Sequence, residues 1–199
     1  MCQFLETIRV ENRVLQHLEY HQQRMERTVK EFFPLSETPV LTDLVAIPDW
    51  IEKGTYKCRV IFSEAIEKIE FEKYFPRRIN TLKIVKDDEV DYSFKFANRS
   101  KLNQLLSHKG ACDDILIVKN GLVTDTSYSN ILLYDGSIWV TPDHPLLPGT
   151  CRQRLLDNHH VTSREITIND LRKFRNFMLI NAMLDFDVRR AVQVSTIKF

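Results

Sequence analysis

A lysine, an arginine, an aspartate and a glycine-opened helix start are the features of this sequence that could take part in chemistry. Lys95 lies in the segment YSFKFANRS. In an extended conformation the three aromatic residues of this segment would share one face, and Lys95 would lie on the other. A lysine in this pattern is either an ordinary solvated side chain or, in a desolvating or cationic environment, an amine nucleophile toward carbonyl compounds. The pattern alone does not choose between the two.

Two further features suit an anion. Arg24, in HQQR, stands three residues after His21 and so lies on the same face of a predicted helix. It is either a solvated arginine or, if it faces inward, a planar fork that could hold a phosphate. In LLPGTCR, Gly149 opens a predicted helix whose first N–H groups and dipole favour an anion. The alternative there is a plain junction between a loop and a helix.

The aspartate lies in a polar segment between predicted strands. Short apolar runs cover 116–118, 131–134 and 138–141, and they are bounded by Lys-Asn-Gly, Asp-Gly and a proline. This pattern is typical of antiparallel strands joined by tight turns. The segment 125–130, DTSYSN, would then be a polar loop that carries Asp125 at the edge of a rigid sheet.

Other elements must position these residues. The predicted elements are a strand over 4–10, a helix over 15–33 ended by Pro34, a shorter helix over 43–53 ended by Gly54, a hairpin of strands 56–62 and 66–75, a strand over 82–85, a helix over 150–158, a short helix over 170–174 capped by Asn169, a strand over 177–180 and a β-rich segment over 191–197. The charged segment DDEVD over 87–91 indicates a boundary. We therefore expect a small domain over 1–88, a linker over 89–94 and a large domain over 95–199.

Composition limits the function classes. A chain of 199 residues with 43% hydrophobic residues can build a globular core. A net charge of +1 argues against nucleic acid as the main partner, since phosphate binding favours a basic excess. The N-terminus has no apolar stretch as long as that of a signal peptide, and no segment has as many consecutive apolar residues as a membrane span requires. The cysteines show no close spacing, so we expect reduced thiols, a cytoplasmic protein and no metal site.

The order of these pieces resembles the class IV aminotransferase family of pyridoxal phosphate enzymes. The resemblance runs from Phe4 to the C-terminus, and it is carried by FLETIRV, HQQRM, FKFANR, LVTDTSYSNI, TPDHPLLPGTCR and FMLINAM. It implies the α/β (α+β) architecture called fold type IV, with a small N-terminal α/β domain, a larger β-rich C-terminal domain and pyridoxal 5'-phosphate between them. It also implies a homodimer.

The resemblance assigns roles to individual residues. Lys95 matches the lysine that forms a Schiff base with the cofactor aldehyde. Arg24 matches the arginine that binds the cofactor phosphate. The other cofactor contacts that the resemblance implies come from Asp125 at the pyridine nitrogen, from the backbone N–H groups of Thr150 and Cys151 at the phosphate, and from Asn181.

The chain departs from the family pattern at three places. Asp125 stands where the family usually has glutamate, and its side chain is one methylene shorter, a difference of roughly 1.5 Å. Thr150 and Cys151 replace the commoner Ile-Thr pair, although backbone groups carry much of that contact. The sequence begins at the strand that usually follows a first β-hairpin, so we expect a bare edge on the small domain that favours self-association.

Three functions remain open. FLETIRV, HQQR, KFANR and LINAM are more similar to the 4-amino-4-deoxychorismate lyases than to branched-chain transaminases. This similarity implies a small-molecule amine substrate that is converted to 4-aminobenzoate and pyruvate in folate synthesis. Arg59 is a candidate for binding the carboxylates of this substrate, and the alternative is that it is a surface arginine. The alternatives are a transaminase for small branched-chain or D-amino acids, and a non-catalytic protein that kept the fold.

Overall fold

The computed structural model describes residues 2–34 and 37–199 of the chain, and these residues form two compact units. The first unit comprises Met1–Pro76 and Phe94–Asn98, and the second comprises Arg77–Ser93 and Arg99–Phe199. The chain therefore leaves the first unit, returns to it for five residues around Lys95 and leaves it again. Within the described ranges, no helix is long and apolar enough to cross a membrane.

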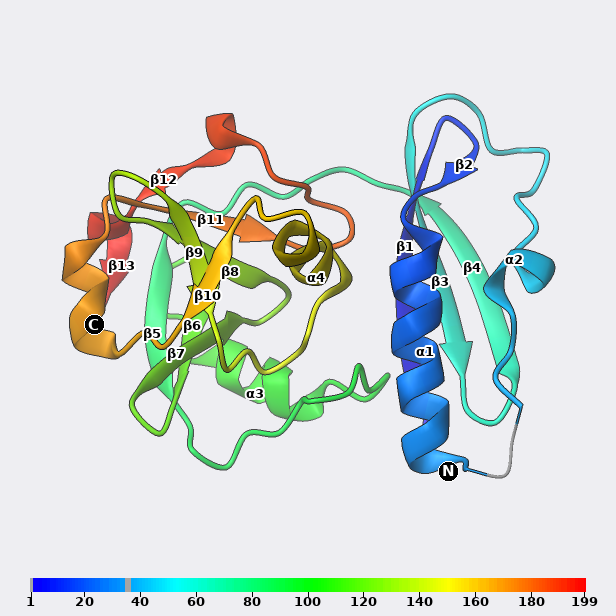
Figure 1. Cartoon of the computed structure of the whole chain (residues 1–199), viewed down its shortest axis with the longest axis horizontal. Coiled ribbons are helices and arrows are strands. Elements are labelled where there is room, and N and C mark those ends of the chain that lie inside the picture. The colour runs from blue at the N-terminus through cyan, green and yellow to red at the C-terminus, as the bar shows by residue number, and fades with distance from the viewer. Residues whose placement is uncertain (1, 35–36) are drawn as a thin grey trace. The chain divides into compact units, whose positions relative to one another are not determined.

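The first unit is an antiparallel sheet with a helix along one face (Figure 1). Its elements are β1 (Phe4–Glu11), β2 (Val14–Leu15), α1 (Leu18–Phe32), α2 (Leu41–Leu44), β3 (Thr55–Phe62) and β4 (Ile66–Lys73), and its strand order is β2-β1-β3-β4. The predicted strand over 4–10 and the predicted hairpin over 56–75 are confirmed.

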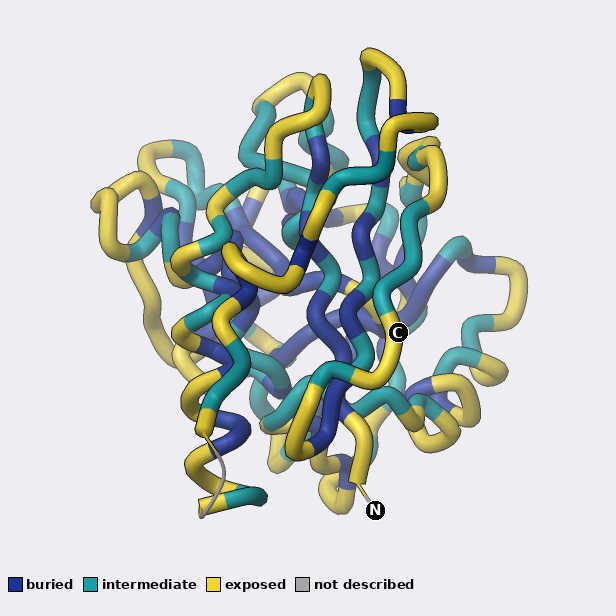
Figure 2. The backbone as a smooth tube through the Cα atoms, turned by 90° about the vertical axis from the view of Figure 1, so that its right-hand side faces the viewer, coloured by how far each residue is buried: buried dark blue, intermediate teal, exposed yellow. Residues whose placement is uncertain are grey.

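Alternation along β1 and helical spacing along α1 create the core of the first unit. Phe4, Ile8 and Val10 are buried on one face of β1, and Met25 and Val29 are buried on α1. Side chains return to the same face every two residues in a strand and every three to four residues in a helix. Both elements therefore present an apolar face to the same core. Along α1 the buried residues recur every three to four positions, with intermediate and exposed residues between them (Figure 2).

The second unit is built around a larger mixed sheet. Its elements are β5 (Leu82–Lys86), α3 (Ser100–Ser107), β6 (Asp114–Lys119), β7 (Leu122–Thr126), β8 (Asn130–Tyr134), β9 (Trp139–Pro142), α4 (Thr150–Asp157), β10 (Thr162–Arg164), η1 (Ile168–Lys173), β11 (Asn176–Ile180), η2 (Val188–Arg190), β12 (Val192–Gln193), η3 (Val194–Thr196) and β13 (Ile197–Lys198). The strand order is β10-β9-β8-β7-β6-β5-β13, and β11 pairs with β8 and β12.

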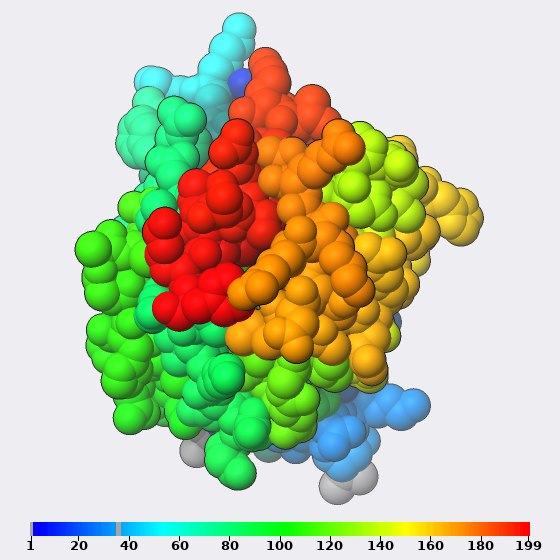
Figure 3. All heavy atoms as spheres, turned by 90° about the vertical axis from the view of Figure 1, so that its left-hand side faces the viewer, coloured from blue at the N-terminus to red at the C-terminus, as the bar shows by residue number. Residues whose placement is uncertain are grey.

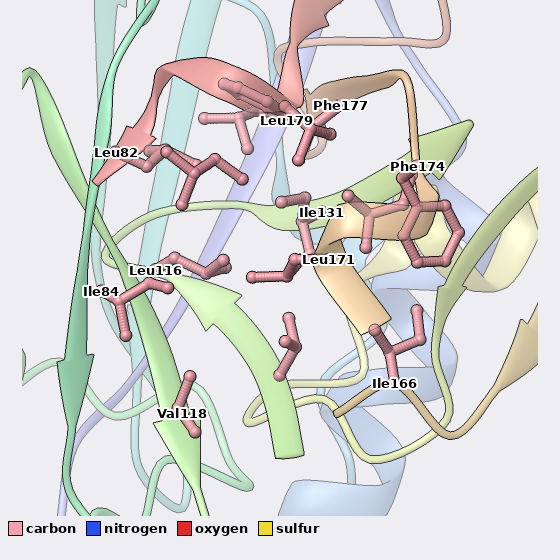
Figure 4. Packing of buried hydrophobic residues seen from close by; sticks show 14 of the residues in the cluster. Leu82, Ile84, Leu116, Val118, Ile131, Ile166, Leu171, Phe174, Phe177 and Leu179 are labelled. Atoms are coloured by element: carbon pink, nitrogen blue, oxygen red, sulfur yellow. The ribbon is translucent and has the colours of Figure 1, made fainter. Parts of the chain in front are cut away.

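Apolar side chains from early and late segments of this unit meet in its core. Leu82 of β5, Leu116 of β6 and Ile131 of β8 pack with Leu171 and Phe177 from the later part of the chain (Figure 4). The C-terminal strand β13 pairs in parallel with β5, and it lies at the surface of this unit, where Figure 3 shows it in red. The core therefore holds together segments that are distant in sequence.

Several elements differ from the sequence prediction. The helix predicted over 43–53 is only the four-residue α2, because Pro48 lacks an N–H group and disfavours helix in the residue before it. Helix α1 begins at Leu18 and not at Leu15, because Leu15 pairs with β1. The segment around Lys95 was expected to be extended, but it forms only an isolated bridge from Phe4 to Phe96 and is not part of a named strand. Helix α3 was not predicted.

The division between the units also differs from the expected one. Residues 77–88 were assigned to the small domain, but β5 pairs in parallel with β6 and so belongs to the second unit. Residue 94 was placed in the linker and residues 95–98 at the start of the large domain, but this segment pairs with β1 in the first unit. Hydrogen bonds between strands, which charge runs do not reveal, decide both assignments.

Candidate functional site

Three buried polar side chains meet between β1 and α1, and we call them the Glu6 cluster: Glu6, His21 and Arg24. Glu6 and His21 are each 1% exposed and Arg24 is 6% exposed. Arg24 donates from Nε to Glu6 Oε1 at 2.7 Å and from Nη2 to Glu6 Oε2 at 2.5 Å. His21 Nδ1 lies 2.6 Å from Glu6 Oε2. One carboxylate therefore holds both an arginine fork and an imidazole.

The charges in the Glu6 cluster are fixed by burial and by mutual contact. Burial acts to raise the pKa of Glu6, but the charge and hydrogen bonds of Arg24, with those of His21, outweigh it and hold that pKa at about 2. Burial lowers the pKa of His21 below its usual value, against the opposing effect of Glu6. At neutral pH the cluster is therefore one carboxylate, one guanidinium and one neutral imidazole.

Lys95 is attached to β1 through its backbone. The main-chain N–H of Leu5 donates to the carbonyl of Lys95 at 2.9 Å, and that of Ala97 donates to the carbonyl of Gln3 at 2.8 Å. The charge of Lys95 also contributes to the lowered pKa of His21. The structure thus brings together two of the predicted cofactor residues, Lys95 and Arg24, around the same strand.

Arg59, the candidate for binding substrate carboxylates, does not join this group. It lies on β3 between Cys58 and Val60, whose side chains are buried in the core. Because neighbouring residues of a strand face opposite sides, Arg59 lies on the face of the sheet opposite to α1. There its Nη1 lies 3.6 Å from a carboxylate oxygen of Glu70. The surface interpretation of Arg59 fits this position.

In the second unit, Asp125 is a buried carboxylate held from two sides. Its Oδ1 accepts a hydrogen bond from Asn130 Nδ2 at 2.8 Å, and its Oδ2 accepts one from the main-chain N–H of Leu147 at 2.9 Å. Burial raises the pKa of Asp125 to about 6, although these hydrogen bonds and the charge of Arg152 act to lower it. Asp125 lies at the end of β7 rather than in a loop, and it pairs with Asn130 of β8.

The start of α4 is connected to Asp125 through Asn130. Asn130 Nδ2 donates to the Leu147 carbonyl at 2.9 Å as well as to Asp125. A Cβ atom on Gly149 would lie 2.1 Å from Asn130 Oδ1, so the residue before the helix must be glycine if Asn130 keeps its place. The structure therefore brings together the predicted ring-nitrogen residue and the predicted phosphate-binding helix start.

The first turn of α4 offers backbone donors rather than a reactive side chain. Thr150 and Cys151 are its first two residues, both are buried, and Gly149 forms no side-chain cap. The first N–H groups of any helix have no partner within the helix, which leaves them available to an anion. Burial raises the pKa of the Cys151 thiol to about 12. The thiol is therefore protonated at neutral pH and is not a nucleophile.

Asn181 connects a turn to the loop that follows Asp125. It donates from Nδ2 to Ser129 Oγ at 2.9 Å, and its Oδ1 accepts from the main-chain N–H groups of Met183 and Leu184 at 2.8 and 3.0 Å. The predicted strand before it is β11, which ends at Ile180. Asn181 thus supports the loop over 127–129.

Several residues that organise these groups were not predicted from the sequence. Glu6 and Asn130 lie within quoted motifs, FLETIRV and LVTDTSYSNI, but they received no role. Arg99 donates from Nη2 to the Ser127 carbonyl at 2.5 Å, and its guanidinium carbon lies 4.1 Å from the centre of the Tyr128 ring. A buried acid in a β-rich segment was the available signal for Glu6, since such a residue requires a partner.

Among the described residues, no group of three or more His, Cys, Asp or Glu side chains could hold a metal ion.

Known proteins and a family model match this chain over nearly its whole length. The family model for class IV amino-transferases matches residues 3–191. An uncharacterised protein of Haemophilus influenzae (strain ATCC 51907 / DSM 11121 / KW20 / Rd) is 35% identical over 185 residues, which are 92% of this chain and 98% of that protein.

Solved structures share the fold. A structure from Haemophilus somnus 129pt, which carries the provisional name 4-amino-4-deoxychorismate lyase, is 34% identical, with a TM-score of 0.88 over 94% of this chain and 98% of that one. A hypothetical aminotransferase from Mycobacterium tuberculosis in its PLP-bound form is 20% identical, with a TM-score of 0.78 over 98% of this chain and 81% of that one. The latter likeness concerns the fold alone.

Proposed function

The chain belongs to the class IV aminotransferase family, and on this premise we propose that it is a pyridoxal phosphate-dependent lyase that converts 4-amino-4-deoxychorismate to 4-aminobenzoate and pyruvate. The expected fold type IV architecture is confirmed by the family match and by the likeness to the Haemophilus somnus structure. The family uses pyridoxal phosphate, so the coarser assignment to a pyridoxal phosphate enzyme family follows from membership.

The likeness to the Haemophilus somnus structure supports the lyase over other reactions. That structure shares 34% of its residues with this chain and covers nearly the whole length of both. The neighbours named aminotransferases have lower identities, such as 18% for the amino-acid aminotransferase structure from Mesorhizobium loti. At that identity a shared fold does not imply a shared substrate.

The residues present fit the cofactor. Asp125 is a buried carboxylate whose oxygens accept hydrogen bonds from Asn130 and Leu147, with a further backbone contact from Leu146, and its remaining lone pairs can accept from a protonated ring nitrogen. Arg24 carries a guanidinium whose plane is fixed by Glu6, and α4 begins with backbone donors next to Gly149. We propose that Arg24 and the N–H groups of Thr150 and Cys151 hold the phosphate.

Each residue then has a defined task. When bound, pyridoxal phosphate supplies an electron sink for negative charge at the amine-bearing carbon of the substrate. Asp125 would keep the ring nitrogen protonated by accepting a hydrogen bond from its N–H group. Lys95 would bind the cofactor aldehyde through Nζ and, after the substrate amine replaces it, would take the proton from the amine-bearing carbon through the same atom.

The proposed reaction balances without a second substrate. Lys95 removes one proton from the amine-bearing ring carbon, and one proton is delivered to the methylene carbon of the enolpyruvyl group. The bond between the ring and the ether oxygen breaks, pyruvate leaves and the ring becomes aromatic. A transaminase, by contrast, needs a keto acid to accept the amino group. This difference provides the test.

The test is to incubate the purified protein with pyridoxal phosphate and 4-amino-4-deoxychorismate in the absence of any keto acid. We expect 4-aminobenzoate and pyruvate in equal amounts. Lys95→Ala should abolish both products, whereas Lys101→Ala, at an exposed lysine paired with Asp87, should leave the rate unchanged. Absence of both products, together with amino transfer that depends on a keto acid, would establish the transaminase instead.

We also propose that the protein is a homodimer, as the family resemblance implies. Light scattering on the eluate of a size-exclusion column should give twice the mass of the chain. A mass equal to that of one chain at micromolar concentration would contradict this assembly.

A further inference from the structure

The Glu6 cluster is more elaborate than the stability of the first unit requires. Glu6 lies in the middle of β1, and its neighbours on the same face are Phe4 and Ile8, which are fully buried. A buried ion pair contributes little net stability, because removing two charges from water offsets most of their attraction. Apolar residues in place of both charged partners, Glu6 and Arg24, would continue the core at least as well. The carboxylate therefore calls for a reason other than packing.

The geometry of the cluster fixes the orientation of Arg24. Glu6 accepts from both Nε and Nη2, and this bidentate contact defines the plane of the guanidinium. Because the group is planar, Nη1 then points away from Glu6. His21 Nδ1, 2.6 Å from Glu6 Oε2, limits rotation of the carboxylate in turn. The chain thus fixes the direction of the arginine's remaining donors.

Direction is what Arg24 can offer an anion, because its net charge is compensated. Glu6 is ionised at neutral pH and balances the positive charge of Arg24. His21 adds no charge when it is neutral. An anion near Arg24 is therefore attracted by aimed N–H groups and less by a net positive field. An arginine of this kind depends strongly on the residue that orients it.

We infer that Glu6 is a positioning residue that orients Arg24 toward the cofactor phosphate, with His21 holding Glu6 in place. This inference rests on the proposed function, in which Arg24 binds that phosphate. Strand β1 has a second task in the same site, since Leu5, the residue before Glu6, holds the backbone of Lys95. A single strand therefore determines the positions of the phosphate-binding arginine and of the lysine.

A purely structural role for Glu6 makes a different prediction. If the cluster only attaches α1 to β1, substitution of Glu6 lowers the fraction of folded protein, and the remaining folded protein binds every form of the cofactor as before. If Glu6 orients Arg24, the protein that remains folded also binds the phosphate less tightly, while its contacts to the rest of the cofactor are unchanged. Pyridoxal, which lacks the phosphate, separates these cases.

The experiment measures the dissociation constants of pyridoxal 5'-phosphate and of pyridoxal by equilibrium dialysis. For Glu6→Gln we expect the dissociation constant of pyridoxal phosphate to rise by roughly 10- to 100-fold, as for loss of a charge-assisted hydrogen bond. That of pyridoxal should stay within about twofold, because no contact to the ring is changed. In an Arg24→Met background, Glu6→Gln should have no further effect, since the residue it orients is gone.

Glu11→Gln is the matched control. Glu11 also lies on β1 and also accepts two hydrogen bonds from an arginine, Arg9, at 3.0 and 2.8 Å. It is outside the Glu6 cluster, so both dissociation constants should match those of the wild type. His21→Leu supplies a second variant that keeps Glu6, and we expect a rise of roughly 3- to 10-fold for pyridoxal phosphate alone.

The outcomes separate the two proposals. If the wild type binds pyridoxal phosphate no better than pyridoxal, the proposed phosphate site fails. If the wild type discriminates but Glu6→Gln and His21→Leu keep the same ratio of the two constants, the positioning role is wrong while the site stands. Tighter binding of pyridoxal phosphate by Glu6→Gln would also overturn it, because Glu6 would then be competing with the phosphate.

Discussion

The main-chain N–H of Leu5 donates a hydrogen bond of 2.9 Å to the main-chain carbonyl of Lys95. These residues are far apart in sequence, yet this contact and the bridge from Phe4 to Phe96 attach the lysine segment to β1. The next residue of β1, Glu6, holds Arg24. The positions of the two residues with the largest proposed roles in the first unit therefore depend on the register of one strand.

Replacing Glu6 alone should lower the free energy of unfolding more than replacing Glu6 and Arg24 together. Glu6→Leu leaves the charge of Arg24 buried without its partner, and we expect the free energy of unfolding to fall by about 3–5 kcal/mol. Adding Arg24→Met removes that charge and should restore most of the loss. Urea denaturation of both variants provides the measurement. Equal or greater destabilisation in the double variant would show that the cluster stabilises the fold through its charges.

The stability of the protein should carry a pH dependence from Asp125. Its pKa is raised from 3.8 to about 6, so between these values the folded state binds more protons at this group than the unfolded state does. By linkage, this group makes the free energy of unfolding decrease as pH rises from about 4 to 6, by up to about 3 kcal/mol. Asp114, whose pKa is also raised by burial, contributes with the same sign, and acids whose pKa is lowered, such as Glu6, contribute with the opposite sign, so the comparison must be made between variants.

Asp125→Asn removes this titration. The free energy of unfolding of the wild type minus that of the variant should therefore decrease as pH rises from about 4 to 6. Urea denaturation at intervals across this range measures the difference. A difference that is independent of pH would mean that folding does not raise the pKa of Asp125.

Gly149→Ala should disturb the support of Asp125. The added Cβ atom would lie 2.1 Å from Asn130 Oδ1, so Asn130 must move and its hydrogen bond to Asp125 must break. We expect a loss of about 1–3 kcal/mol in the free energy of unfolding. Because both changes act through Asn130, Gly149→Ala should add little in an Asn130→Ser background. Additive losses in the double variant would contradict this coupling.

The thiols should differ sharply in reactivity. Cys2 is exposed, whereas burial raises the pKa of both Cys58 and Cys151 to about 12. Because the thiolate is the reactive form, iodoacetamide should modify Cys2 in the native protein and leave Cys58 and Cys151 unmodified. Peptide mass spectrometry would measure this order. Modification of Cys151 as fast as that of Cys2 would show that the start of α4 opens readily.

The sequence predicted elements with a strong periodic signal and missed those decided by tertiary contact. β1, the β3–β4 hairpin and the strands β6, β8 and β9 follow from alternation and turn residues, whereas β7 was not predicted, because its last residues were assigned to the polar loop. α3 is short, and only Leu102 and Leu105 are buried on it, so its pattern is weak. α2 failed as a long helix because the apolar pattern was followed past Pro48.

The candidate site was predictable by family resemblance but not by its connections. Lys95, Arg24 and Asp125 could be named because the order of the motifs resembles the class IV aminotransferases, and an amine, a guanidinium and a carboxylate suit the chemistry of the cofactor which that resemblance implies. Their supports could not, because each joins distant segments: Glu6 lies 18 residues before Arg24, and Asn130 lies 17 residues before Leu147. Such pairs become visible only when the strands and helices are packed.

Product formation from 4-amino-4-deoxychorismate by the protein loaded with pyridoxal phosphate is the decisive measurement for the lyase reaction. We expect many turnovers that release one 4-aminobenzoate for each pyruvate, at a rate that is unchanged when a keto acid is added. Formation of neither product, or consumption of substrate only when a keto acid accepts its amino group, would contradict it.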